Sequence, residues 1–169
     1  MKTRVLKPIF AICAAAFLWS SSANALERAP VLSLEAAQKI AAGCVAKAKE
    51  MKWKMNVAVV DTGANLVVFE RMDGAFLGSG DIARKKAETS AKFPFSTRFV
   101  EELAYGKDRA GGGAVPGIAH VPGMVAFAGG VLLMAGDAHI GGVGVSGGTA
   151  DEDEICAKAG LEYAKDLLK

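Results

Sequence analysis

The sequence lacks most of the motifs by which common enzyme classes are recognised. Only 2 of its 169 residues are histidine, and it has neither a His-Glu-x-x-His pattern nor a Ser-His-Asp motif, which argues against a zinc enzyme or a conventional hydrolase. No Gly-Lys-Ser/Thr sequence occurs, so a phosphate-binding P-loop is excluded. Cys-x-x-Cys is also absent, which excludes a thioredoxin-like site and covalent c-type haem attachment.

Long apolar runs are missing too, apart from a short one near the N-terminus. No segment reaches the roughly 18 uninterrupted apolar residues of a transmembrane helix. The short run, residues 9–19, follows three basic residues and precedes an Ala-x-Ala motif that ends at residue 25. This pattern predicts a secretory signal peptide over residues 1–25. We therefore expect a periplasmic or secreted protein that has no stable membrane insertion once the signal is removed.

The chain has no strong excess of either charge once this segment is set aside. Three of the 20 basic residues and none of the 18 acidic residues lie in the predicted signal, so the remainder carries a net charge of about −1. The remaining Lys and Arg do not form a cluster that would neutralise several phosphates. A nucleic-acid partner is therefore not expected.

Cysteine is scarce as well, with three in the whole sequence. Cys13 lies in the predicted signal, which leaves Cys44 and Cys156. In an exported protein this pair could form a disulfide between the first and last helices. The two residues could equally be buried free thiols that pack as small apolar side chains. The sequence leaves both interpretations open.

Apolar residues recur at helical and strand spacings along the rest of the chain. The expected elements are, in order, a helix from Ser33 to Met51, strands 56–61 and 66–72, a helix from residue 82 to before Pro94, a short helix after Ser96, strands 124–128, 131–135 and 139–145, and a final helix from Thr149, which forms a capping box with Glu152. Connections as short as those between the last strands join only antiparallel neighbours. The order predicts one α+β domain over residues 26–169, with a five-stranded antiparallel sheet flanked by helices.

The sequence Gly142-x-Gly144-x-x-Gly147 has the spacing of a dinucleotide-binding fingerprint, but its context does not fit one. That fingerprint needs a helix and then a second parallel strand, and too little chain follows Gly147 for both. Four acidic residues, 151–154, also occupy the helix start where a pyrophosphate would bind. The glycines instead leave one strand face bare, and either a ligand or a helix of the same domain could lie against it.

Three stretches resemble the GlcG/HbpS family of haem-binding or haem-degrading domains, which also occurs as the C-terminal part of PduO-type proteins. They read VAVVDTGANLVVFERMDGA, GDIARKKAETSAKF and GGVGVSGGTADEDEICAKAG. The resemblance covers residues 26–169 and implies a profilin-like α+β fold, with homo-oligomers common in the family. Some family members bind haem, some degrade it and some are exported. The motif matches fall on Val57 to Asp61, Glu70-Arg71-x-Asp73, Lys86, Gly144 to Thr149, and Asp153.

Haem requires an apolar slot and usually an axial ligand such as His, Met, Cys or Tyr. His120 lies in an irregular Gly- and Pro-rich segment, residues 106–123, and segments of this kind are often functional. We predict His120 and His139 as candidate ligands, with Phe95 and Phe99 as an apolar wall. The bare backbone at Gly144, Gly147 and Gly148 is a further candidate contact for the cofactor. Alternatively, His120 is an exposed loop histidine and His139 a satisfied strand-edge histidine.

Two other sites are conceivable from the residues. Arg71, Lys86 and Thr149, with the amides near Gly147 and Gly148, could form a pocket for a small organic acid. Asp151 and Glu154 could hold iron, although acids in a first helical turn are favoured by the helix dipole in any case. The sequence thus predicts an exported haem-binding protein with oxidative haem-degrading activity as a further expectation. The alternative is an accessory protein or enzyme that binds a small organic acid in a glycolate-type pathway.

Overall fold

The computed structural model describes residues 29–169, and the predicted signal peptide, residues 1–25, lies outside this range. The elements run in the order α1 (Leu34–Met51), β1 (Asn56–Asp61), β2 (Leu66–Arg71), α2 (Ser79–Lys92), α3 (Thr97–Tyr105), the 3₁₀ helix η1 (Pro116–His120), β3 (Gly130–Ala135), β4 (Ala138–Ser146), α4 (Ala150–Tyr163) and the 3₁₀ helix η2 (Lys165–Leu167). None of the helices among these residues is long and apolar enough to cross a membrane.

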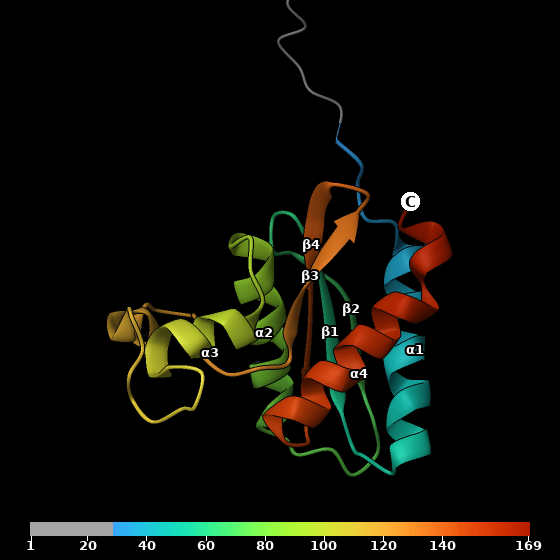
Figure 1. Ribbon diagram of the computed structural model, residues 1–169. Helices are drawn as coiled ribbons and strands as arrows, with labels where there is room; N and C mark the ends of the chain where they lie inside the picture. Colours follow the sequence, from blue (N-terminus) through green and yellow to red (C-terminus); the bar gives the residue numbers. More distant parts are fainter. Residues whose placement is uncertain (1–28) are drawn as a thin grey trace, which may run out of the picture.

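The strands form one antiparallel sheet in the order β2-β1-β4-β3. α1 and α4 cover one face of this sheet and α2 covers the other, while α3 and η1 extend beyond α2 (Figure 1). Because side chains alternate along a strand, Val57 and Val59 point into the larger core under α1 and α4. Ala58 and Val60 point toward α2. The predicted α+β class and antiparallel pairing are therefore confirmed.

The predicted fifth strand is wrong, because segment 124–128 does not join the sheet. Two of its backbone amides are bound by side chains of the neighbouring helices instead. The amide of Val125 donates to Thr89 Oγ1 at 3.1 Å, and that of Ala128 donates to Glu101 Oε2 at 3.2 Å. These two bonds hold the segment against α2 and α3 instead of pairing it with the sheet.

The glycines of β4 allow α2 to lie directly against the sheet. A Cβ atom on Gly144 would stand 2.1 Å from the carbonyl oxygen of Ala83, and one on Gly142 would stand 2.3 Å from that of Ala87. No side chain fits in that space. Of the two interpretations of the bare strand face, the structure supports the packed helix.

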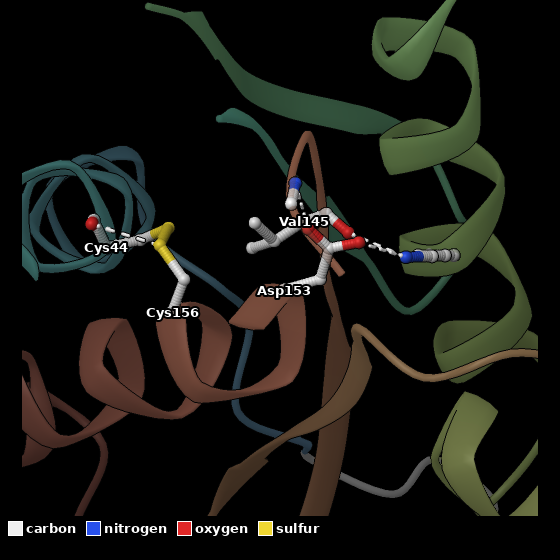
Figure 2. Close-up of a disulfide and its surroundings, with 6 residues drawn as sticks. Cys44, Val145, Asp153 and Cys156 are labelled. Atoms are coloured by element: carbon white, nitrogen blue, oxygen red, sulfur yellow. Dashed lines mark hydrogen bonds and ion pairs between the residues drawn. A yellow bond between two sulfur atoms is a disulfide. The ribbon is translucent and has the colours of Figure 1, made fainter. Parts of the chain in front are cut away.

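A disulfide joins Cys44 of α1 to Cys156 of α4, with 4.7 Å between their Cα atoms (Figure 2). Both cysteines are fully buried in the larger core. The open question about the two cysteines is thus decided in favour of the disulfide, which connects two helices 112 residues apart in sequence.

Candidate functional site

A half-exposed apolar surface forms where α3 meets the segment that carries His120. The ring of Phe95 lies 5.7 Å from that of Phe93 and 5.4 Å from that of Phe99. Phe95 also packs, with three residues of segment 118–124, on buried residues of α3 and on Ala126. We call the following set the aromatic surface: Phe93, Phe95, Phe99, Ile118, Ala119 and Met124.

Local sequence signals build this surface. Pro94 follows the end of α2, and Ser96 caps α3 by accepting a hydrogen bond from the amide of Phe99. The amide of Val115 donates to the carbonyl of Leu103 at 2.8 Å, which holds η1 against α3. His120 is the last residue of η1 and is exposed. The structure therefore packs Phe95 with the segment of His120, and Phe99 lies against Phe95.

His139 lies elsewhere, at the start of β4 in the hairpin with β3 (Figure 1). It is half-buried, and its Nε2 lies 2.8 Å from the carbonyl oxygen of Gly141. This contact fits the alternative interpretation, a satisfied histidine at a strand edge. The structure does not bring His139 and His120 together, so only one of the two can serve the aromatic surface.

The three glycines predicted to contact a cofactor have structural roles. Gly144 is covered by α2, as described above, and is closed to any ligand. At Gly147 the backbone has φ +148°, and a Cβ atom would stand 2.2 Å from the carbonyl oxygen of Lys54. The amide of Gly148 donates to Asp153 Oδ1 at 3.0 Å. The predicted contact of Gly144 with a cofactor is therefore wrong, and Gly147 and Gly148 form the turn into α4.

Lys86 forms a buried ion pair instead of lining a pocket. Its Nζ donates to Asp153 Oδ2 at 2.6 Å and to the carbonyl of Val145 at 3.1 Å, and the ring of Phe127 covers it at 4.5 Å. Figure 2 shows Asp153 reaching from α4 toward Val145 and α2. Burial lowers the pKa of Lys86 and raises the pKa of Asp153, and the attraction between the two groups opposes both shifts. The lysine ties α2, β4 and α4 together.

The predicted acid pocket of Arg71, Lys86 and Thr149 is consequently not formed. The hydroxyl of Thr149 caps α4 by accepting from the amide of Glu152 at 3.3 Å. Arg71 lies at the end of β2 and is exposed. It lines a pocket of about 310 Å³ between β2 and α1, of which neither Lys86 nor Thr149 is a part.

The predicted cation site at Asp151 and Glu154 is occupied by a side chain. Arg98 of α3 forms an ion pair with Asp151 and donates from Nε to Glu154 Oε2 at 2.8 Å. Lys158 binds the other oxygen of Glu154 at 2.6 Å. Within residues 29–169, no group of three or more His, Cys, Asp or Glu side chains is placed to hold a metal ion. The structure does not support iron binding by these two carboxylates.

A family model described as "Haem degrading protein HbpS-like" matches residues 32–162 of this sequence. The chain belongs to the HbpS-like family. An uncharacterised 15.0 kDa protein of Citrobacter freundii is 32% identical over 146 residues, which is 85% of this chain and 99% of that protein. The crystal structure of HbpS has a TM-score of 0.72 at 34% identity and covers 82% of this chain and 93% of that one. The crystal structure of a PduOC:heme complex has a TM-score of 0.72 at 28% identity and covers 79% and 95%.

The predicted family is thus confirmed, and the matched region of this HbpS-like protein includes every candidate residue discussed above. Sequence reasoning missed Arg98 and Glu101. Arg98 Nη1 lies 3.3 Å from Glu101 Oε2, and Arg109 Nε lies 2.8 Å from Glu101 Oε1. The spacing of three residues between Arg98 and Glu101 was a readable sign of a helical ion pair. The partners of Arg98 on α4, Asp151 and Glu154, lie more than 50 residues away in sequence, so no local pattern indicates them.

Proposed function

We propose that this HbpS-like protein is an exported haem-binding protein, with haem against the aromatic surface and His120 as the axial ligand. The observation that carries the proposal is the meeting of α3 and η1, which places half-exposed phenylalanines beside the segment of an exposed histidine. The family description and the solved complex of a relative with haem support it. Export rests on the predicted signal peptide at residues 1–25.

The side chains at this site suit haem chemically. Rings of Phe95 and Phe99 offer an apolar wall for the porphyrin, and a neutral imidazole is a common iron ligand. Bound haem supplies a redox-active iron, and oxidative degradation of haem is the finer part of this proposal. The residues of this chain hold the ring and exclude water from one of its faces. We also propose that the protein forms homo-oligomers, because Phe76 and Leu77 leave 71% and 82% of their surfaces exposed.

Titration of the purified protein with hemin tests the ligand assignment, with the Soret band as the readout. We expect saturable binding with a dissociation constant of about micromolar, and we expect His120→Ala to weaken it about tenfold or more. His139→Ala is the matched control, since the ring of His139 already contacts Gly141, and it should leave the band unchanged. Non-saturating binding, or a loss with His139→Ala alone, would overturn the assignment.

Two further measurements test the finer claims. Incubation of the haem complex with a reductant and oxygen should bleach the Soret band if the protein degrades haem. A stable band would limit the function to binding. N-terminal sequencing of protein recovered outside the cytoplasm should begin after residue 25 if the signal peptide is cleaved, and recovery of uncleaved protein inside the cell would contradict export.

A further inference from the structure

We propose a second ligand site, for a small carboxylic acid, in the pocket between the end of α1 and the end of β2. The pocket has a volume of about 310 Å³, at the lower end of the range for small-molecule sites. It lies on the α1 side of the sheet, whereas the aromatic surface lies beyond α2 (Figure 1). The proposal does not rest on haem binding.

The pocket forms where the end of α1 meets the end of β2. Val45 and Lys49 lie one helical turn apart on α1 and so share one face. Lys52 follows the last residue of α1, and its left-handed backbone (φ 61°) turns the chain toward β1. The amide of Met72 donates to the carbonyl of Met55 at 3.0 Å, which extends the pairing beyond β2 and fixes the residues that follow Arg71.

The side chain of Lys54 lies alongside Gly74 and lines the same pocket. The side-chain carbons of Lys54 lie 3.8 to 3.9 Å from the position that a Cβ atom would take on Gly74, where the backbone has φ +80°. This glycine lets the chain turn after Asp73 while the lysine lies alongside it. Lys54 therefore joins Lys49 and Arg71 around one pocket.

The charged side chains around the pocket form no ion pairs with one another among the described residues. Lys49, Lys54 and Arg71 line it together with the carboxylates of Glu70 and Asp73. Among the ion pairs of the part of the chain that the structure describes, none involves any of these five side chains, although many other charged residues are paired. Cations and carboxylates that share an opening without bonding keep their donors and acceptors available to a ligand.

The chemistry of the lining selects the ligand class. Arg71 offers paired N–H donors that match a carboxylate, and the two lysines add positive charge nearby. Glu70 and Asp73 are acceptors, so they favour a hydroxyl or ammonium group on the same ligand. Val45 and Met72 pack against the larger core and offer an apolar contact for a short carbon chain. The ligand is a small acid with a hydroxyl or an amino group, as in 2-hydroxy acids and α-amino acids.

Calorimetry with three compounds of one carbon skeleton tests the class. L-lactate carries a carboxylate and a hydroxyl, L-alanine carries a carboxylate and an ammonium group, and lactamide has no charge. We expect at least one of the two acids to bind saturably and lactamide to bind about tenfold more weakly or worse. Equal binding of lactamide, or no binding of either acid at tens of millimolar, would overturn the proposal.

Substitutions locate the site. Arg71→Met and Lys49→Met should each weaken binding of the acid about tenfold, because each removes a donor to the carboxylate. Lys47→Met is the matched control on the same helix, since Lys47 pairs with Glu50 at 3.0 Å and does not line the pocket. It should change binding less than twofold. Equal losses in all three variants would show a general charge effect and would overturn the site.

Competition between hemin and the acid tests whether this pocket is separate from the proposed haem site. Protein saturated with hemin should bind the acid with unchanged affinity, and Arg71→Met should leave the hemin titration unchanged. If hemin displaces the acid and Arg71→Met weakens hemin binding, the pocket belongs to the porphyrin site and the proposal of a separate acid site fails. If hemin does not bind at all, the haem proposal fails, while the acid titration still tests the proposal of the acid site.

Discussion

The two faces of the sheet are packed by different means. Under α1 and α4, the core contains branched and long side chains such as Ile40, Val143 and Leu133, together with the disulfide. Under α2, small residues face one another, with Ala83 and Ala87 against the glycines of β4. Large side chains fill the core on the first face. On the second face, the backbone of α2 packs directly against the backbone of β4.

This difference has consequences for how each face is held. The first face buries much apolar surface and has a covalent link between its helices. The second face buries less, and α2 is fixed by the ion pair of Lys86 with Asp153, which spans from one face to α4 on the other. The stability of the second face should therefore depend on the Lys86–Asp153 ion pair and on the glycines of β4. Variants at the ion pair and at the glycines measure these two contributions separately.

The largest expected effect is the loss of the buried ion pair. Lys86→Met leaves Asp153 buried without its partner, and removal of one member of such a pair costs about 3 to 5 kcal/mol of unfolding free energy. Urea denaturation measures this loss. Lys85→Met is the matched control, because Lys85 is exposed and forms a surface ion pair with Asp81, and it should change stability by about 0.5 kcal/mol or less.

A double variant tests whether the unpaired charge of Asp153 causes the loss of stability in Lys86→Met. Lys86→Met with Asp153→Asn removes both charges, keeps an oxygen that can accept from the amide of Gly148, and should recover part of the loss, since no buried charge is left without its partner. If the double variant is as unstable as Lys86→Met, then the lysine acts through packing under Phe127 and not through its charge.

The next effect concerns the disulfide on the first face. Cys44→Ala with Cys156→Ala should lower the unfolding free energy by about 2 to 4 kcal/mol, because the cross-link restricts a long loop in the unfolded chain. Urea unfolding of the unmodified protein with and without a thiol reductant provides an independent value. No difference in either experiment would mean that the core under α1 and α4 alone sets the stability of this face.

Close packing on the second face should be sensitive to a single methyl group. Gly144→Ala places a Cβ atom against the carbonyl of Ala83, and such overpacking costs about 1 to 3 kcal/mol. Gly78→Ala is the control, because a Cβ atom at Gly78 would have no neighbour within 4 Å. Thermal unfolding of the two variants side by side measures the contrast. A tolerant Gly144→Ala would show that α2 can move away from the sheet.

Much of the fold could be predicted from periodicity and caps. The capping box of Thr149 and Glu152 marks the start of α4, and the two β-rich stretches 56–61 and 66–71 form the expected hairpin. Segment 124–128 has the apolar composition of a strand, yet its amides bind Thr89 and Glu101. A local pattern cannot show which distant side chain will take a backbone donor, and this is why the fifth strand was wrong.

The candidate site was predicted less completely for the same reason. The proximity of Phe95 to residues 118–119 agrees with the prediction, since only α3 and part of the irregular segment separate them in sequence. The expected partnership of Arg71 and Lys86 failed because α2 faces the opposite side of the sheet from the pocket of Arg71. Which face of a sheet a helix covers is decided by the packing of the whole chain.

The smallest effect expected is a pH dependence at the ion pairs of α3 with α4. Burial tends to raise the pKa of Glu154, but the hydrogen bonds from Lys158 and Arg98 outweigh it and lower the pKa below its ordinary value of 4.5. The folded state therefore holds this carboxylate charged more strongly than the unfolded state does. The stabilisation is complete above pH 4.5 and is lost as the pH falls through the lowered value.

Glu154→Gln isolates this contribution from that of other carboxylates. Urea unfolding between about pH 7 and pH 3 should show a shallower decline of stability in acid for Glu154→Gln than for the unmodified protein, by about 1 kcal/mol or less because Arg98 and Lys158 are partly solvated. Asp153 should behave in the opposite sense, since burial raises its pKa and its protonation in acid is favoured by folding. Parallel acid profiles for Glu154→Gln and the unmodified protein would mean that the ion pairs of Glu154 with Arg98 and Lys158 contribute no net stability.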